Sequence, residues 1–217
     1  MDWRTAGAVN AIKDQGQCGS CWAFSAIGTL EGAHFLATGN LLSFAEQQLV
    51  DCNRSWTGNH GCNGGWYYTA WSYLHSSFAI EESVYKYTAQ NGTCEYAQLD
   101  KTNVETLKTT YPTKNNSDQL KAAVAKQPVS VAIEADKLVF QQYSSGVFDS
   151  AKCGTTLDHA VMLVGYGTEN GQDYFILRNS WGTTWGEKGY MKLAYTAGDT
   201  SVGTCGVNQM PAYTSAD

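Results

Sequence analysis

Charged residues are scarce in this chain, and basic residues are fewer than acidic ones. Only 16 % of the 217 residues are charged, and 14 basic against 20 acidic side chains leave a net charge of −6. A dedicated nucleic-acid binder normally carries a basic face, so we expect no nucleic-acid partner. Long apolar runs are lacking too. The uncharged stretch 57–80 is interrupted by Gly, Asn, Ser and Thr, unlike a bilayer-spanning helix of about 20 apolar residues, so no membrane partner is expected.

A signal-peptide pattern is also missing from the start of the sequence, and any secretory leader is therefore expected to lie in a removed segment. What is present points to a compact globule. Aromatic residues make up 12 % of the chain and Gly occupies 22 positions. The length predicts between one and two domains with a sizeable core, and the composition is unlike that of a disordered chain.

The cysteine content is the next informative feature. An odd number of cysteines suggests paired bridges and one leftover thiol, and disulfides persist along a secretory route. Three Asn-x-Ser/Thr glycosylation sequons, at Asn53, Asn91 and Asn115, fit such a route. The alternative is a reduced cytosolic protein with inert buried thiols. The seven cysteines stand at positions 18, 21, 52, 62, 94, 153 and 205.

The first half of the chain has helical periodicity. Small and apolar residues recur every three or four positions over 20–37, which predicts a helix with Ser20 as N-cap and Gly39 as its stop. Ser43 and Glu46 form a capping-box pattern before a short helix at 46–51. A third helix is expected after Gly65.

The second half of the chain has the alternating residue pattern of β-strands. Residues alternate over 129–133 and 159–163, and 174–177 is a short apolar run. Frequent glycines between these segments indicate turns. The polar segment 106–116 is the predicted boundary between a helical and a β part.

The environment of Cys21 favours a reactive thiol. The segment Gln15-Gly-Gln-Cys-Gly-Ser-Cys21 ends in the first turn of the predicted helix. Unpaired backbone amides and the positive end of the helix dipole stabilise a thiolate there. The Gln15 amide, together with the backbone N–H of Cys21, could stabilise an oxyanion.

Two other interpretations fit the same Cys-x-x-Cys spacing, a dithiol redox site and half of a zinc site. The redox interpretation lacks a preceding strand, and the zinc interpretation lacks a second close pair of ligands, because Cys52, Cys62 and His60 are scattered. On local chemistry alone, both remain open.

A nucleophilic thiol needs a base, and the sequence contains four histidines. His34, His60 and His75 fall in a helix, a loop and a helix end, where structural or solvated roles are expected. His159 instead opens an apolar strand, and Asn179 follows downstream. A neutral amide can fix a histidine tautomer without adding charge near a thiolate.

At this point the residues resemble a known family. Gln15 to Phe24, Asp51-Cys52, Gly61-Cys-Asn-Gly-Gly65, Asp158-His159-Ala160 and Asn179-Ser-Trp-Gly182 are similar to the signature blocks of the papain-like cysteine proteases, closest to the cathepsin L-like endopeptidases. The start, Asp2-Trp-Arg, resembles that of a mature enzyme. The resemblance covers essentially the whole chain in order.

The resemblance implies an α+β, two-lobed papain-like fold with the active-site cleft between its lobes. One catalytic unit would span 1–217, with a mainly helical lobe at 7–108, an antiparallel β-barrel-like lobe at 109–207, and residues 1–6 crossing onto the latter. It also implies the pairs Cys18–Cys62, Cys52–Cys94 and Cys153–Cys205, leaving Cys21 free. A Cys18–Cys62 bridge would remove the redox interpretation.

The family pattern assigns roles to individual residues. Cys21 would be the nucleophile, His159 the general acid and base, Asn179 its orienting partner and Gln15 an oxyanion donor, with Trp181 shielding the Asn179–His159 hydrogen bond. The alternative for the pocket residues, Leu157 in particular, is a simple core role. The substrate-binding set implied is Gly64, Gly65, Trp66, Tyr67, Ala132, Leu157, Asp158, Ala160, Trp181 and Met210.

The implied function is a cysteine endopeptidase that prefers an apolar substrate residue two before the scissile bond. Family exopeptidases carry a His-bearing insertion across the cleft, and none follows Gly65. No cofactor or metal is expected. Expected partners are protein and peptide substrates, its own propeptide and cystatin-like inhibitors, for a monomer that is lysosomal, vacuolar or secreted. The alternative function is a catalytically silent binding or storage protein.

Overall fold

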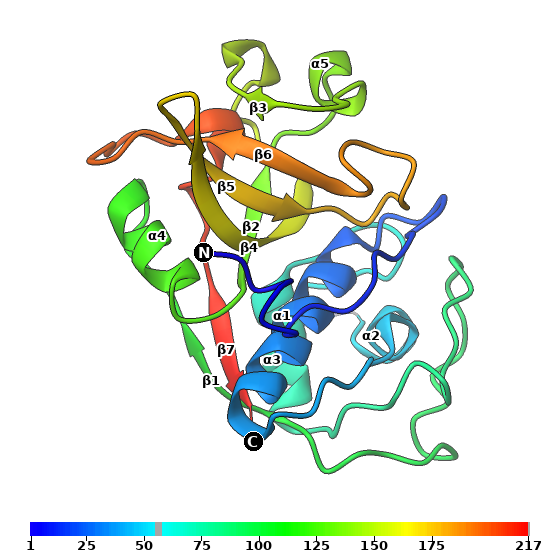
Figure 1. The fold of residues 1–217 in the computed structure, drawn as a ribbon. Coiled ribbons are helices and arrows are strands. Elements are labelled where there is room, and N and C mark those ends of the chain that lie inside the picture. The colour runs from blue at the N-terminus through cyan, green and yellow to red at the C-terminus, as the bar shows by residue number, and fades with distance from the viewer. Residues whose placement is uncertain (55–57, 217) are drawn as a thin grey trace.

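The computed structural model describes residues 1–54 and 58–216. Figure 1 shows the larger helices in one part of the molecule and the main sheet in another. The helices are α1 (Cys21–Thr38), α2 (Glu46–Cys52), α3 (Tyr67–Leu74), α4 (Ser117–Val124) and α5 (Leu138–Gln141), with 3-10 turns η1 (Ala151–Cys153) and η2 (Thr204–Gly206). The strands are β1 (Thr106–Thr110), β2 (Val129–Ile133), β3 (Val147–Phe148), β4 (His159–Glu169), β5 (Gln172–Arg178), β6 (Tyr190–Ala194) and β7 (Tyr213–Ala216).

Helix α1 lies within one residue of its predicted bounds and is buried over most of its length. It ends as expected at Gly39, whose φ of 79° is left-handed and whose backbone N–H donates to the Phe35 carbonyl at 2.7 Å. Ser20 occupies the N-cap position, but its side chain makes no capping bond. Its hydroxyl lies 2.6 Å from the Tyr87 hydroxyl instead.

The predicted capping box before α2 is wrong, although the helix itself is present. Ala45 occupies the N-cap position and makes no side-chain cap. The Ser43 hydroxyl donates to Glu82 at 2.8 Å, and the Glu46 carboxylate accepts from the Lys13 ammonium at 2.8 Å. The Lys13 ammonium therefore binds the Glu46 side chain that would otherwise have completed the capping box. The third helix follows Gly65 as predicted, starting at Tyr67.

The main sheet has five strands in the order β2-β4-β5-β6-β3. Three of its pairings are antiparallel, whereas β3 runs parallel to β6. Strands β2 and β3 lie at the two edges, so the described strands form an open sheet and not a closed barrel. The register that matters for the site is set between β2 and β4, where Ala132 faces Ala160 and Ile133 faces His159.

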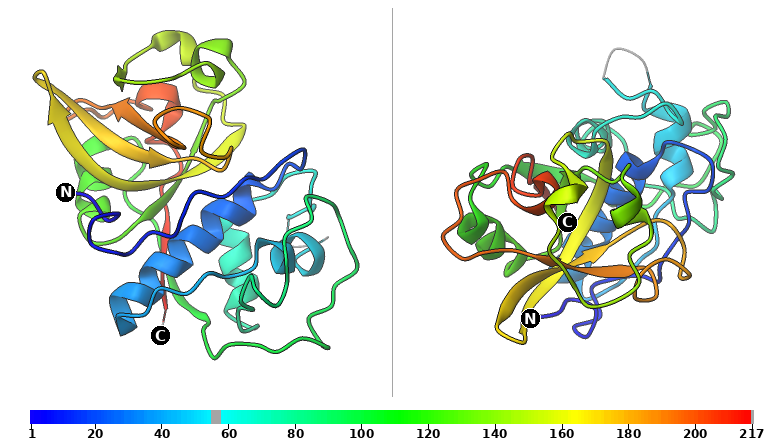
Figure 2. Two further views of the ribbon diagram at one scale, coloured as in Figure 1. Left: turned by 45° about the vertical axis from the view of Figure 1, so that its right-hand side comes forward. Right: turned by 90° about the horizontal axis from the view of Figure 1, so that it is seen from above.

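The predicted boundary segment contains a strand. Strand β1 pairs antiparallel with β7, with Thr110 opposite Tyr213. The polar threonines of β1 suggest a linker in the sequence, but their β-branched side chains also suit a strand. Figures 1 and 2 show β7 running from the region of the sheet down beside α1. Its Ala216 belongs to the same hydrophobic cluster as Leu30 of α1.

Two large hydrophobic clusters make up most of the core. One lies against one face of the main sheet and includes Phe140, Phe175 and Leu177. The other joins α1, α2 and α3 around Trp22 and Trp71. Helix α1 contacts β2 and β4 of the sheet, and Cys21 at the start of α1 lines the same cavity as His159 at the start of β4.

Candidate active site

The loop before Cys21 is fixed by a disulfide and by a close backbone contact. Cys18 is bonded to Cys62, and the Gly19 backbone N–H donates to the Cys62 carbonyl at 2.8 Å. A Cβ atom at Gly19 would lie 2.5 Å from that carbonyl oxygen, so only glycine fits. Cys21 then occupies the first position of α1 and is the free cysteine among the described residues.

His159 opens β4 and faces the thiol from the sheet. It is buried and lines the same cavity as Cys21. Its Nε2 atom lies 2.8 Å from Asn179 Oδ1, which holds the tautomer that turns the other ring nitrogen toward Cys21. The Trp181 indole stacks on the imidazole at 4.8 Å between ring centroids.

The two groups shift each other's protonation in opposite directions. Burial raises the pKa of Cys21, but the hydrogen bond and charge of His159 and the backbone N–H groups of Ala160 and Trp22 outweigh it, so this pKa is lowered. Burial lowers the pKa of His159, but the bond to Cys21, its charge, Asn179 and Asp158 raise it overall. The arrangement therefore favours a thiolate beside an imidazolium.

Gln15 is held beside this pair by contacts with two loops. Its Oε1 atom accepts from the Ser180 hydroxyl at 2.7 Å, and its Nε2 atom donates to the Cys18 carbonyl at 3.0 Å. Its backbone N–H donates to the Ser180 carbonyl at 2.9 Å. The Gln15 amide, next to the N-terminus of α1, is thus tied directly to the residue that follows Asn179.

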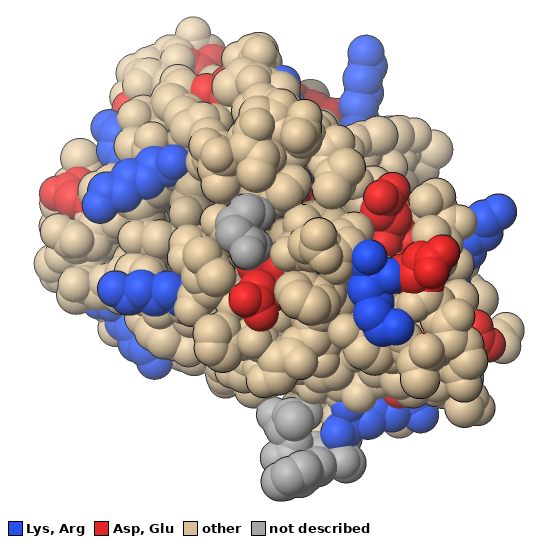
Figure 3. Space-filling view, turned by 90° about the horizontal axis from the view of Figure 1, so that it is seen from below, with Lys and Arg blue, Asp and Glu red and all other residues tan. Residues whose placement is uncertain are grey.

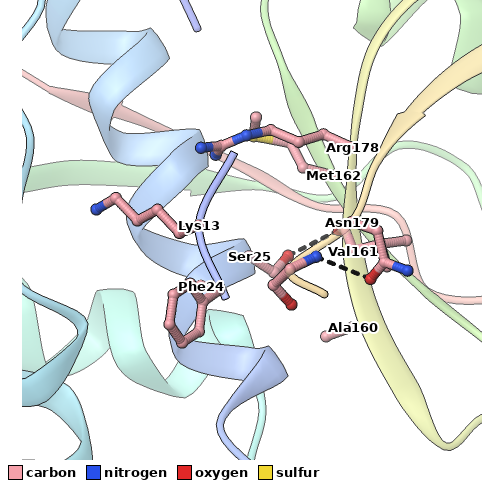
Figure 4. A pocket seen from close by; sticks show the side chains of 9 residues that line it. Lys13, Phe24, Ser25, Ala160, Val161, Met162, Arg178 and Asn179 are labelled. Carbon is pink, nitrogen blue, oxygen red and sulfur yellow. Dashed lines mark hydrogen bonds between the residues drawn. The ribbon is translucent and has the colours of Figure 1, made fainter. Parts of the chain in front are cut away.

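Buried hydroxyl groups lock α1 against the sheet below the pair. The Ser25 hydroxyl lies 2.8 Å from both the Ser130 hydroxyl and the Val161 carbonyl, and the Thr29 hydroxyl lies 2.8 Å from Ser130. Figure 4 shows Ser25 of α1 turned toward Val161 beside a small cavity that also touches Asn179. These bonds set the distance between the helix that carries Cys21 and the strand that carries His159.

A cavity of about 170 Å³ opens beside the thiol. Residues from the helical side and from the sheet both line it, so substrate bound there would lie between them. Asp158 is held at its edge because its Oδ1 accepts from the Ala135 backbone N–H at 2.7 Å. The lining residues are Cys21, Gly64, Gly65, Trp66, Ala132, Leu157, Asp158, His159 and Ala160.

Three residues of the predicted substrate set, Tyr67, Trp181 and Met210, do not line this cavity. The Tyr67 ring is fully buried, and its hydroxyl donates to the Met210 carbonyl. Met210 is half-buried and packs in the same hydrophobic cluster as Trp66 and Leu157. The Tyr67 hydroxyl turns inward to reach this backbone acceptor, and neither residue is among those that line the cavity. Trp181 is placed on His159 and not on the cavity.

The remaining cysteines form the pairs Cys52–Cys94 and Cys153–Cys205. With Cys18 bonded to Cys62, the dithiol interpretation of Cys18 and Cys21 is wrong. Within residues 1–54 and 58–216, no three His, Cys, Asp or Glu side chains are grouped so as to hold a metal ion.

The other predicted positions are placed as follows. His34 lies beside Thr38 in α1, and the His75 ring bonds the Thr106 carbonyl at 2.7 Å. Of the sequon residues, Asn91 and Asn115 are exposed. Asn53 is 1 % exposed, with its amide donating to the Thr69 carbonyl at 3.3 Å, and glycosylation at the three sequons stays a prediction. Ser55 of the Asn53 sequon lies outside the described residues.

Surface charge and helix length are the features relevant to nucleic-acid and membrane partners. Figure 3 shows one face on which acidic and basic side chains are interspersed among a large uncharged area. None of the helices in the described part of the chain is long and apolar enough to cross a bilayer.

A family model described as papain family cysteine protease matches residues 1–215, and this chain belongs to that family. The "Probable cysteine protease RD21B" of Arabidopsis thaliana is 49 % identical over 215 residues, which are 98 % of this chain and 45 % of the relative. "Digestive cysteine proteinase 2" of Homarus americanus is 45 % identical, covering 98 % of this chain and 65 % of that protein. The chain spans about half the length of the first of these curated relatives.

Solved structures agree with this assignment. The bromelain protease from Ananas comosus in complex with the E64 inhibitor superposes with a TM-score of 0.92 at 39 % identity, covering 99 % of this chain and 97 % of that one. The proform of the ragweed pollen allergen Amb a 11, a cysteine protease, gives a TM-score of 0.91 at 39 % identity, covering 99 % and 65 %. The papain-like α+β fold predicted from the motifs is thereby confirmed.

Sequence reasoning missed part of the site's support. Ser180 has no signal of its own beyond its place in the Asn179 motif, yet it holds Gln15. Ser130 stands in an alternating strand pattern, where a hydroxyl is typical of a polar surface position. Only the pairing of β2 with β4 and the crossing of α1 reveal that it is buried.

Proposed function

We propose that this chain is a cysteine endopeptidase. The observation that carries the proposal is that Cys21 and His159 line one cavity, with His159 Nε2 held 2.8 Å from Asn179 Oδ1. A thiolate is the reactive form of cysteine, and an orienting amide keeps the imidazolium in place without competing for its charge.

In the proposed mechanism the Cys21 thiolate attacks the carbonyl carbon of the scissile peptide bond. The new oxyanion accepts from the backbone N–H of Cys21 and from the Gln15 amide. The intermediate then expels the amine, which takes its proton from the His159 imidazolium and leaves a thioester on Cys21. Neutral His159 next removes a proton from water, whose oxygen displaces the thiolate and releases the acid.

The proposed specificity follows from the cavity beside the thiol. Trp66, Ala132, Leu157 and Ala160 give it apolar walls. We call the substrate residue two before the scissile bond the specificity residue, and we assign it to this cavity. Burying a Leu or Phe side chain gains about 1.5 to 3 kcal/mol, whereas burying an unpaired guanidinium costs several kcal/mol.

The proposal extends to partners and location. One structural neighbour is a proform, and another is a complex with the E64 inhibitor. A propeptide or a cystatin-like inhibitor of this chain would bind along the same cleft. We also propose that the chain acts as a monomer in a lysosomal, vacuolar or secreted setting, with Asn91 and Asn115 as the accessible sequons.

The test combines labelling with turnover. An epoxide peptide that reacts with thiols should label Cys21 once per chain, as located by mass mapping. Fluorogenic Phe-Arg dipeptides should be cleaved far faster than Arg-Arg ones. Cys21→Ser should lose both labelling and turnover while keeping the wild-type melting temperature. Labelling without turnover, or no labelling at all, would instead favour the silent binding or storage protein.

A further inference from the structure

A lysine contacts Met210, which packs against the same hydrophobic cluster as the cavity residues Trp66 and Leu157. The Lys114 ammonium lies 3.1 Å from the Met210 sulfur. Lys114 is exposed and, among the described residues, is not in a salt bridge with any carboxylate. Its positive charge is thus available to a ligand that reaches Met210.

The backbone holds Lys114 at this place. The pairing of β1 with β7 brings the chain after Thr110 alongside the residues before Tyr213. Directly after Lys114, the Asn115 backbone N–H donates to the Asn208 carbonyl at 2.7 Å. Asn115 has a φ of 53°, a left-handed conformation that Asn tolerates better than most residues, so the turn that fixes Lys114 suits its sequence.

Met210 is held from the opposite side. Its carbonyl accepts from the Tyr67 hydroxyl, and Tyr67 itself begins α3. Its flexible side chain packs in the cluster that contains Leu157 and Trp66, two residues that line the cavity. A methionine side chain adjusts readily to a neighbour, so a long substrate side chain can pass Leu157 and replace the contact between Lys114 and the sulfur.

We propose that Lys114 determines specificity by accepting an acidic side chain at the specificity residue and by disfavouring a basic one. This inference rests on the proposed function. Apolar side chains keep their preference, because the cavity walls are apolar. Among polar side chains, Glu is selected over its uncharged isostere Gln, since its carboxylate can pair with the ammonium while its methylene groups contact Leu157.

The one carboxylate that lines the cavity does not cancel this effect. Asp158 is already engaged by the Ala135 backbone N–H at 2.7 Å and directly precedes His159 in the chain. Lys114 contacts Met210, which does not itself line the cavity. In the proposal, a Glu side chain that extends past Leu157 to Met210 meets the Lys114 ammonium and not Asp158.

The experiment compares three dipeptide substrates, Phe-Arg, Gln-Arg and Glu-Arg, at about pH 6, where the Glu carboxyl is ionised. The measured quantity is the ratio of kcat/KM for Glu-Arg to that for Gln-Arg. In Lys114→Gln this ratio should fall roughly two- to five-fold, as expected for an exposed ion pair. In Lys114→Glu it should fall further, and cleavage of Arg-Arg should rise. Added salt should reduce the wild-type ratio.

Lys126→Gln is the matched control, because it removes one exposed positive charge just after α4 and should leave the ratio unchanged. Phe-Arg turnover and epoxide labelling report on the protease itself in every variant. If these are normal and the ratio is the same in wild type and Lys114→Gln, or falls equally in Lys126→Gln, the inference is overturned and the proposed function stands. If wild type neither cleaves Phe-Arg nor takes the label, both are overturned.

Discussion

At the scale of single residues, the reactive thiol depends on neighbours that do not take part in bond making. Asn179 bonds His159 through its Oδ1 atom, which also accepts from the Ser180 backbone N–H at 2.8 Å. Ser180 in turn holds Gln15. The orienting amide and the proposed oxyanion donor are therefore connected by one residue, and a change at Asn179 alters orientation without removing the nucleophile.

The first prediction concerns Asn179→Ala. Removing a hydrogen bond to a charged group costs about 1.5 to 3 kcal/mol, so we expect kcat/KM for Phe-Arg to fall roughly ten- to a hundred-fold while epoxide labelling of Cys21 persists. Since Asn179 also helps raise the pKa of His159, the alkaline limb of the pH profile should move to lower pH. Complete loss of labelling would show that Asn179 is needed for the thiolate itself.

The second prediction is the wild-type pH profile. The pKa of Cys21 is lowered and that of His159 is raised, so the ion pair exists between the two resulting titrations. The rate should be bell-shaped, with an acid limb for thiolate formation and an alkaline limb for loss of the imidazolium proton. The measurement is kcat/KM for Phe-Arg across pH. A rate that rises steadily to about pH 9, the ordinary range of a free thiol, would contradict a preformed pair.

At the scale of elements, periodicity locates helices well and caps poorly. The apolar spacing over 20–37 predicts α1, because a buried helix face repeats every three or four residues whatever surrounds it. The capping box at Ser43 fails because Lys13, far away in sequence, binds Glu46. Strand β1 resembles a linker in sequence, because only its pairing with β7 distinguishes it from a polar loop.

The candidate site is predictable to a similar extent. Cys21 and His159 can be selected from position and chemistry, since one starts a helix and the other a strand. Their closeness cannot, because it depends on the Ser25, Thr29 and Ser130 hydroxyls that join α1 to the sheet. The inward turn of the Tyr67 hydroxyl, which removes Tyr67 and Met210 from the cavity wall, has no local sequence signal either.

The third prediction tests that junction between elements. In Ser130→Ala the buried Ser25 and Thr29 hydroxyls each lose a partner, at a cost of about 1 to 3 kcal/mol. The melting temperature should fall by roughly 2 to 10 °C, and kcat/KM should also fall, because the helix with Cys21 is held less firmly against β4. Ser145→Ala, at an exposed position, is the control and should change neither. An unaltered melting temperature in Ser130→Ala would mean that these hydroxyls do not hold the junction.

At the scale of the whole molecule, a buried charge cluster joins segments that are distant in sequence. The Lys13 ammonium lies 2.8 Å from Glu46 in α2, 3.4 Å from Glu31 in α1 and 2.9 Å from Glu82. Glu31 and Glu46 are almost fully buried. One ammonium cannot neutralise three carboxylates, so protonation of the most buried one is favoured in the folded chain.

The last prediction follows from this imbalance. Burial raises the pKa of Glu46 to about 7, with Lys13 opposing the shift and Glu31 adding to it. Between the ordinary value of 4.5 and about 7 the folded chain binds more protons than the unfolded chain. The contribution of Glu46 is thus complete below 4.5 and is lost as pH rises through 7, a change on the order of 3 kcal/mol. Glu82, whose pKa is lowered, changes stability only at more acid pH.

Unfolding free energy should therefore decline from about pH 5 to about pH 8. It can be measured by urea titration in Cys21→Ser, which prevents self-digestion and removes the coupled thiol. Adding Glu46→Gln keeps an acceptor for Lys13 without a titrating proton, and the decline should flatten. Glu95→Gln, at an exposed carboxyl, should leave the decline in place. An equal decline with and without the Glu46→Gln change would assign the pH dependence to another group. It would also mean that Lys13 keeps the Glu46 carboxyl ionised.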